Sequence, residues 1–246
     1  HAVGHFHGGK WTKNMWQHEM VVFNDVIHNV GEINHDDSIK LNFTSDDIVG
    51  FRAPYLEGNK GLLSTLTKLN YKYDASDTEQ GLDPTSWPKP YNLGRNKRIW
   101  NFGLGFIKSY GKENATRIPS MDYNFCFRYD KGCREKYPEA LVNNKENGQK
   151  VLLSYIQYFL DNYNNNRAPI HIGHHFRDYQ GGVYTNALFT FAKLVCTKPE
   201  VKCVTYKTLS EFMENHSEEE IQNFQKGIFP KLDSKLTFDE LVAEIK

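Results

Sequence analysis

Apolar residues recur at helical spacing in five stretches of the chain, and each stretch predicts a helix. These stretches are residues 13–30, 59–69, 148–163, 182–195 and 208–215. Short apolar runs between them predict buried strands, at residues 48–51, 71–73, 99–102, 105–108, 168–173 and 201–206. Strands that alternate with helices in this way favour a parallel sheet or an α/β barrel, in which the chemistry lies at the carboxyl ends of the strands.

The remaining stretches predict loops and an appendage. Residues 75–96 are rich in Gly, Pro, Asp and Asn and predict a long loop, while residues 109–147 follow no regular period. Residues 217–246 are charged and have a helical period. We expect them to form a helical C-terminal appendage to a main domain of residues 1–216.

The composition narrows the class of protein. Lys plus Arg and Asp plus Glu both number 30, so the formal net charge is zero, which counts against a nucleic-acid-binding protein. No apolar run approaches the roughly 20 residues that a membrane helix needs. Aromatic residues reach 14%, which fits either a large core or a surface on which sugar rings stack. The opening residues have no signal-peptide pattern, so we expect a fragment or a processed product.

The four cysteines form two local pairs of equal spacing. Cys126 precedes Cys133 as Cys196 precedes Cys203, with a separation of seven residues in each pair. Three pairings are possible, and the local one needs only short loops to close. Neither pair has the C-x2-C spacing of a zinc knuckle. We therefore expect disulfides and an oxidising compartment, with the protein secreted, extracellular or periplasmic.

Histidines gather near the start of the chain. His1 and His5 stand four residues apart, and on one helical turn both imidazoles would lie on one face, close enough to share a metal ion. His7 is a further candidate ligand. Surface histidines and the remnant of a histidine tag are the alternative interpretations of this motif.

Charged side chains follow two of the predicted strands. Arg52 ends the strand at 48–51, and a guanidinium at a buried strand end needs a carboxylate partner. Asp74 and Asp77 follow the next strand, so we expect them at the same edge of the sheet. The arrangement is either a structural ion pair or an arginine that orients an active-site carboxylate.

A run of histidines ends the apolar stretch at 168–173. Side chains alternate in a strand, so His174 would face one way and His171 and His175 the other. An imidazole has an ordinary pKa near neutrality, which suits a general acid. For each of these histidines, a structural hydrogen bond to a backbone carbonyl is the alternative.

Taken in order, these motifs resemble the polysaccharide deacetylase family (carbohydrate esterase family 4, the NodB homology domain). The family's zinc-binding H-[S/T]-x-x-H motif is matched by His1 and His5, with Ala2 where Ser or Thr is usual. The later family motifs are matched by Arg52-Ala53-Pro54-Tyr55, by Tyr71–Asp77, by Ser120-Met121-Asp122-Tyr123 and by Ile172-Gly173-His174. The resemblance covers residues 1 to about 215 and implies a distorted (β/α) barrel.

One family motif has no counterpart before His1. The T-F-D-D motif of the family lies upstream of the histidine motif and supplies the catalytic base and a third metal ligand. The similar Thr237-Phe238-Asp239-Glu240 is better explained as a helix capping box ahead of Leu241. We therefore expect that the chain lacks the family's first strand.

The resemblance implies a metal-assisted removal of N-acetyl groups from N-acetylglucosamine units of a polysaccharide such as chitin or peptidoglycan. Zn²⁺, or another divalent ion such as Co²⁺, would be held by His1 and His5. His174 would be the general acid, with His175 as its close competitor, and Arg52 would position the base. The substrate would contact Tyr55, Trp87, Trp100 and Asp77, although each tryptophan could equally belong to the core.

The resemblance also implies how these residues are arranged. The opening imidazole pair and the pair at 174–175 would meet in one cleft around one ion, in a monomer without a membrane span. Three alternatives remain. They are an inactive carbohydrate-binding protein on the same fold, a copper oxygenase that uses His1 as a histidine brace, and an α/β domain whose histidines lie on the surface.

Overall fold

The computed structural model describes residues 1–78, 83–91, 93–94, 98–130, 133, 144–175, 177–231 and 233–245. Its α-helices are α1 (Lys13–His28), α2 (Val30–Ile33), α3 (Lys60–Lys68), α4 (Asp122–Tyr129), α5 (Asn144–Tyr163), α6 (Val183–Val195), α7 (Tyr206–Glu214), α8 (Glu218–Gln225) and α9 (Phe238–Ala243). Its strands are β1 (Gly50–Phe51), β2 (Tyr73–Asp74), β3 (Lys89–Pro90), β4 (Trp100–Asn101), β5 (Phe106–Ile107) and β6 (Ile118–Pro119). The predicted mixture of helices and strands is confirmed.

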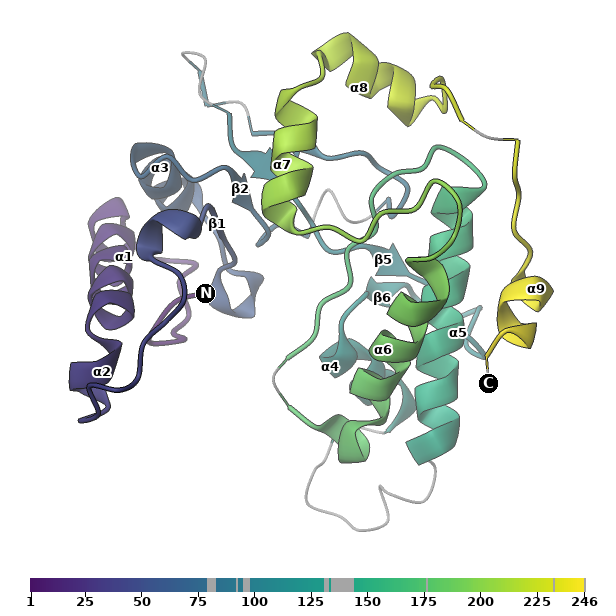
Figure 1. Ribbon diagram of the computed structural model, residues 1–246, viewed down its shortest axis with the longest axis horizontal. Helices are drawn as coiled ribbons and strands as arrows, with labels where there is room; N and C mark the ends of the chain where they lie inside the picture. The colour runs from purple at the N-terminus through teal and green to yellow at the C-terminus, as the bar shows by residue number, and fades with distance from the viewer. Residues whose placement is uncertain are drawn as a thin grey trace. The chain divides into compact units, whose positions relative to one another are not determined.

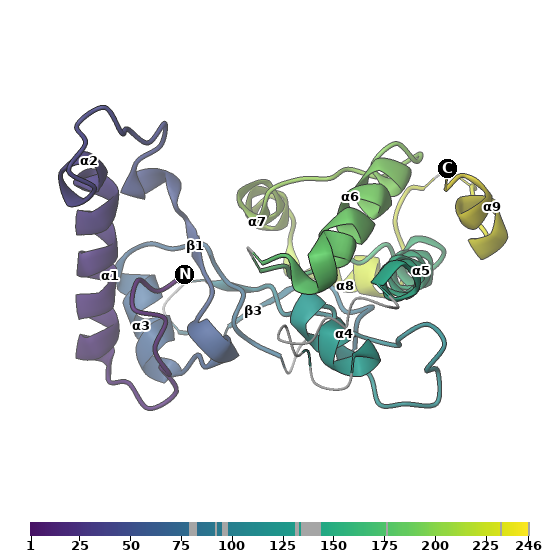
Figure 2. The same ribbon diagram turned by 90° about the horizontal axis from the view of Figure 1, so that it is seen from below.

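The chain divides into two compact units (Figures 1 and 2). Unit 1 comprises His1–Asp77, Pro88–Gly103 and Tyr206–Phe212. Unit 2 comprises Thr78–Trp87, Leu104–Thr205 and Met213–Lys246. The helices expected after residue 216 are α8 and α9, and both belong to unit 2. The division into a catalytic domain and an appendage stays a prediction.

Unit 1 is organised by a small sheet with strand order β1-β2-β4-β3. The first three strands are parallel, and their register aligns Phe51 with Asp74 and Asp74 with Asn101. Parallel strands end at one edge of a sheet, so Arg52 and the residues after Asp74 emerge together, as expected. The core beside the sheet is formed by buried side chains of α1, α3 and β1, namely Trp16, Met20, Leu62, Leu66 and Phe51.

Polar caps begin the two helices of this core. The Thr12 hydroxyl accepts the Met15 N–H at 3.3 Å before α1, and the Asn59 amide oxygen accepts the Leu62 N–H at 3.0 Å before α3. With these caps, the two helices begin within one residue of the starts that the sequence pattern predicted.

Unit 2 is built around α5, which lies beside α6 in both views (Figures 1 and 2). Aromatic and aliphatic residues of both helices are buried between them, including Tyr155, Phe159 and Phe191. The short helix α9 packs Leu241 into the same core. Thr237 and Glu240 form the expected capping box at the start of α9, so the helical interpretation of this segment is confirmed.

Two predicted strands are wrong. Residues 168–173 form only one isolated bridge, between Met121 and Gly173. The ladder stops there because the chain opposite enters helix α4 at Asp122. Residues 201–205 are not a strand either, since Val201 closes a turn onto Lys198. The region 109–147, expected to be irregular, contains β6 and the whole of α4.

The described strands do not close into a barrel. They form one four-stranded sheet in unit 1 and the two-stranded pair β5-β6 in unit 2. In the parts of the chain that the structure describes, no helix has both the length and the apolar character needed to cross a membrane.

Candidate functional site

The opening loop carries the first group of histidines. His1 and His5 lie with their ring centroids 4.9 Å apart, edge to face. The loop is not the expected helical turn, because His5 has a left-handed backbone (φ 50°) and residues 1–7 form no helix. The sharp bend at His5 brings the rings together instead. Both residues are exposed.

Asn59 fastens this loop to α3. Its side-chain amide donates to the carbonyl oxygens of Gly8, Gly9 and Trp11, at 3.2, 3.1 and 2.9 Å. Its amide oxygen also accepts the Trp16 indole N–H at 3.0 Å. The Asn59 side chain therefore holds the histidine loop to the same helix start that it caps.

His1 is tied to the end of β1. Its Nδ1 lies 2.6 Å from the carbonyl oxygen of Arg52, and the Arg52 Nε donates to the carbonyl oxygen of Ala75 at 3.3 Å. The backbone at Arg52 thus orients His1, while the guanidinium spans the ends of β1 and β2. Whether Arg52 positions a catalytic base stays a prediction.

A short stack of rings extends from His5. The Tyr55 ring lies 5.0 Å from the His5 ring and stacks on the His7 ring at 3.9 Å, with an angle of 11° between the planes. Tyr55 is 55% exposed and has a left-handed backbone (φ 57°). The His7 Nδ1 lies 2.9 Å from Glu57 Oε1. The hydrogen bond to His7 lowers the pKa of Glu57 from its ordinary value.

Asp74 is a buried carboxyl behind this edge. Its oxygens accept the Ser76 hydroxyl and the Tyr91 hydroxyl, the latter at 3.1 Å, while Ser76 Oγ accepts the Ala53 N–H at 2.8 Å. Burial raises the pKa of Asp74 to about 6, against the opposing effect of these hydrogen bonds. Asp74 therefore links the ends of β1 and β2. Asp77 accepts a hydrogen bond from the Asn101 amide.

The ligand set of the opening loop is partial. Among the described residues no group of three His, Cys, Asp or Glu side chains is placed to hold a metal ion. His1 and His5 alone form a pair of nitrogen donors at the start of the chain. In metal sites the second ring nitrogen of a histidine ligand is commonly held by a backbone carbonyl, which is the contact that His1 makes with Arg52.

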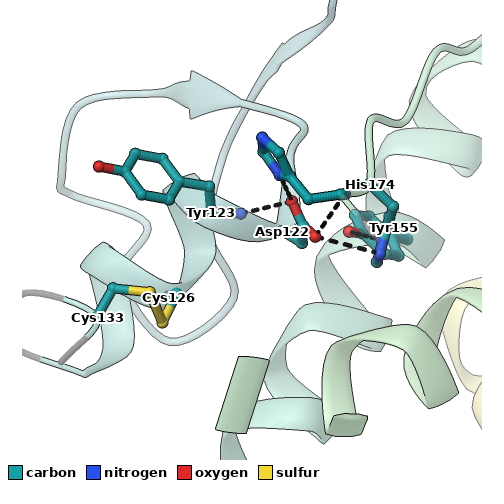
Figure 3. A network of polar contacts seen from close by, with 7 residues as sticks. Asp122, Tyr123, Cys126, Cys133, Tyr155 and His174 are labelled. Carbon is teal, nitrogen blue, oxygen red and sulfur yellow. Dashed lines mark hydrogen bonds and ion pairs between the residues drawn. A yellow bond between two sulfur atoms is a disulfide. The ribbon is translucent and has the colours of Figure 1, made fainter. Parts of the chain in front are cut away.

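The second group of histidines surrounds Asp122 in unit 2 (Figure 3). The Asp122 carboxylate is 1% exposed. It accepts the Tyr123 N–H at 2.7 Å and the His175 N–H at 2.8 Å, and its Oδ1 lies 2.6 Å from His175 Nδ1. The His174 Nδ1 lies 3.7 Å from Oδ2. Backbone N–H groups of the protein therefore donate to both oxygens of the carboxylate, and the Nδ1 atoms of both imidazoles lie near it.

Backbone pairing brings these groups together. The Gly173 N–H donates to the Ser120 carbonyl at 2.8 Å, and the Asp122 N–H donates to the Gly173 carbonyl at 3.2 Å. A Cβ on Gly173 would lie 3.2 Å from Leu104, so a larger residue fits poorly there. His174 and His175 follow this pairing directly, and the Nδ1 atoms of both lie near the Asp122 carboxylate. The alternation expected for a strand does not hold.

The two imidazoles differ in exposure and partners. The His175 side chain is 42% exposed, whereas that of His174 is 12% exposed. The His174 Nε2 lies 3.0 Å from the hydroxyl of Tyr155, a fully buried residue of α5. Burial lowers the pKa of His174, with Asp122 opposing and His175 reinforcing the shift. His175 is thus held at Nδ1 and partly exposed, whereas the Nε2 of His174 contacts Tyr155 and its Nδ1 has no hydrogen-bond partner among the described residues.

The tryptophans expected to contact sugar lie in the core. Trp100 is fully buried in β4, and Trp87 is 7% exposed and donates its indole N–H to the Asn166 carbonyl at 2.9 Å. Their burial fits the core role that the sequence left open. Exposed aromatic side chains near the histidines include Tyr55 in unit 1 and Tyr123 in unit 2.

Both expected disulfides are present. Cys126 bonds Cys133, with their Cα atoms 4.9 Å apart, and Cys196 bonds Cys203, with their Cα atoms 5.6 Å apart. The first bond fastens α4, the helix whose first residue is Asp122 (Figure 3).

Sequence reasoning missed the roles of two members of the second group. Asp122 was matched to a family motif only as part of Ser120-Met121-Asp122-Tyr123, in a segment expected to be irregular, although Phe125, Cys126 and Tyr129 recur there at helical spacing. Tyr155 was assigned to an apolar helix face, and nothing in the sequence marks its hydroxyl as a partner of an imidazole.

Comparison with known proteins gives one distant likeness to report. A solved structure of a putative polysaccharide deacetylase from Mycobacterium smegmatis matches 85% of this chain and 60% of its own chain, with 16% identity and a TM-score of 0.49. The chain thus spans less than two thirds of that protein. At this level the likeness does not establish the family or the activity. No family model matches the sequence, and no curated protein matches it.

Proposed function

We propose that the protein is a metal-dependent hydrolase that removes N-acetyl groups from N-acetylglucosamine units of a polysaccharide. The ordered motifs of the sequence support this proposal. The observation that carries it is the exposed His175 imidazole, whose Nδ1 is held 2.6 Å from the buried carboxylate of Asp122. An imidazole fixed at one nitrogen and open at the other is the arrangement of a general acid or base.

The proton balance of the reaction assigns the role of His175. Hydrolysis adds the oxygen of water to the acetamide carbonyl carbon and breaks the bond between that carbon and nitrogen. The departing nitrogen must take up a proton to leave as an amine, and the other product is acetate. His175 would give this proton from Nε2, while Asp122 stabilises the charged imidazolium beforehand. The proton lost by the attacking water would go to a carboxylate base, which the resemblance assigns to the family's T-F-D-D motif.

His175 suits this role better than His174. The resemblance placed the role on His174, with His175 as its competitor. The Nε2 of His174 is occupied by the Tyr155 hydroxyl, and its side chain is 12% exposed. A general acid must reach the substrate, so the more exposed neighbour is the better candidate.

The opening loop fits a divalent ion such as Zn²⁺ or Co²⁺ at two ligand positions. His1 and His5 would hold it, since their rings lie 4.9 Å apart and the Arg52 carbonyl fixes His1 at Nδ1. The ion would polarise the acetamide carbonyl and lower the pKa of a water molecule. The stack of Tyr55 on His7 would present a flat exposed ring to a sugar.

The finer parts of the proposal follow from the resemblance. They are a distorted barrel architecture, a polymer such as chitin or peptidoglycan as substrate, and action outside the cell. The two disulfides are in keeping with an oxidising compartment.

The proposal is tested by incubating the zinc-loaded full-length protein with chitin oligosaccharides and with peptidoglycan, and measuring released acetate. We expect release from at least one polymer, and about a hundredfold lower kcat for His175→Ala. His28→Ala is the matched control, because His28 is an exposed histidine at the end of α1. If neither polymer releases acetate, the catalytic proposal is wrong and the three alternatives, among them an inactive carbohydrate-binding protein, remain.

A further inference from the structure

Tyr155 and His174 form a buried pair behind the proposed acid, and this pair has no part in the reaction as described above. Tyr155 projects from α5 and is fully buried. Its hydroxyl lies 3.0 Å from His174 Nε2, and the other ring nitrogen of His174 lies 3.7 Å from Asp122 Oδ2 (Figure 3). One imidazole thus stands between a phenol and a buried carboxylate.

The two neighbours of His174 favour the same placement of its proton. A neutral imidazole carries one N–H and one lone pair. A carboxylate attracts the N–H and repels the lone pair, so the proton belongs on Nδ1. The phenol has a proton to donate, because burial raises its pKa well above the ordinary value. The lone pair of Nε2 accepts that proton, while the Nδ1–H, which has no hydrogen-bond partner among the described residues, faces the Asp122 carboxylate at 3.7 Å.

The opposite tautomer would disturb the site. With its proton on Nε2, His174 would point the lone pair of Nδ1 at Asp122 Oδ2, the oxygen that also accepts the His175 N–H at 2.8 Å. Repulsion there would displace the carboxylate that holds His175 at Nδ1. The geometry of His175 therefore depends on which nitrogen of His174 carries the proton.

We propose that Tyr155 is a positioning residue that fixes His174 as its Nδ1–H tautomer, and that His174 and Asp122 together hold His175 in the orientation needed for proton transfer. The functional part of this inference rests on the deacetylase proposal. The structural part does not, because the tautomer of His174 is a property of the protein without substrate.

The matched pair of variants is Tyr155→Phe and Tyr158→Phe. Both residues are buried tyrosines of α5, and both changes remove only a hydroxyl. The Tyr158 hydroxyl accepts the backbone N–H of His171 at 3.4 Å rather than contacting an imidazole. A general effect of losing a buried hydroxyl would appear in both variants, and an effect on the tautomer only in the first.

The first measurement is the ¹⁵N spectrum of the protein labelled in its histidines, near neutral pH and without substrate. We expect His174 to show a single Nδ1–H tautomer in the wild type and in Tyr158→Phe. In Tyr155→Phe we expect a mixture of tautomers or the Nε2–H form. An Nε2–H tautomer in the wild type would overturn the proposal without recourse to any variant, as would an unchanged spectrum in Tyr155→Phe.

The second measurement is the steady-state kinetics of acetate release. For Tyr155→Phe we expect kcat to fall about tenfold with KM unchanged, because misorientation of the acid affects the chemical step. Tyr158→Phe should keep both constants. Equal kinetics in the two variants would contradict the positioning role. A wild type that releases no acetate would reject the deacetylase proposal, while the ¹⁵N spectra would still decide the tautomer.

Discussion

The two histidine groups of this molecule are built in opposite ways. His1 and His5 lie on an exposed loop, and the contact that fixes His1 is to a backbone carbonyl. His174 and His175 instead surround a carboxylate that is 1% exposed and satisfied by backbone and side-chain donors. The first group leaves nitrogen donors for something from outside the chain. In the second group both imidazoles contact the buried carboxylate of Asp122, which suits orientation and proton transfer.

The largest expected effect is the complete loss of bound zinc when the imidazole of His1 or His5 is removed. We expect stoichiometric zinc after dialysis of the full-length protein and its loss in His1→Ala and His5→Ala, because a ligand has been deleted. Metal content by mass spectrometry checks this. His28→Ala should keep its zinc. A wild type that retains no zinc would leave the two imidazoles without the metal role.

Asp122→Ala should have the largest effect on stability. It strands the backbone N–H groups of Tyr123 and His175 inside the protein, and the expected loss is about 4 kcal/mol of unfolding free energy. Urea denaturation measures it. The corresponding change beside the opening loop, Glu57→Ala, should leave the midpoint unchanged, since Glu57 pairs with His7 at the surface. Equal effects of the two substitutions would remove the contrast between the groups.

His175→Ala should separate catalysis from metal binding. We expect kcat to fall about a hundredfold, equivalent to about 2.7 kcal/mol, because the leaving nitrogen loses its proton donor. Zinc content should stay at the wild-type value. Parallel kinetics and metal analysis of the variant check both parts. If the zinc disappears with the activity, His175 is a ligand and not the acid.

Asp74 should make a smaller contribution to the free energy of unfolding, and this contribution should depend on pH. Its pKa is raised to about 6 in the folded protein, so the folded state holds the proton more tightly than the unfolded chain. The stabilisation is complete below about pH 4 and is lost as the pH rises through 6, by about 3 kcal/mol. Asp74→Asn should remove this dependence in denaturation curves between pH 4 and 7. A variant with the wild-type slope would show that another group is responsible.

Helices were predictable from the sequence because their patterns are long. The helix at 148–163 shows its apolar period over several turns and became the centre of unit 2 as α5. The capping box at Thr237 was equally clear, because it consists of adjacent residues. The disulfides followed from spacing alone. Local signals of this kind need no knowledge of what the chain packs against.

The strands and the second histidine group depended on distant partners. The run at 168–173 looks like a strand, but its neighbour turns into α4 after one bridge. That early turn places Asp122 where both His174 and His175 reach it. Tyr155 is separated from His174 by 19 residues and meets it only because α5 packs beneath the loop. Hydrophobic patterning predicts that Tyr155 is buried, but not that its hydroxyl meets a ring nitrogen.

The most direct test is an NMR measurement of a chitin oligosaccharide incubated with the zinc-loaded full-length protein. The acetamide methyl signal should decline as the free acetate signal rises by the same amount. The conversion should stop when a chelator removes the metal, and it should slow about a hundredfold in His175→Ala. Unchanged acetamide signals, or acetate release that His175→Ala does not slow, would contradict the account.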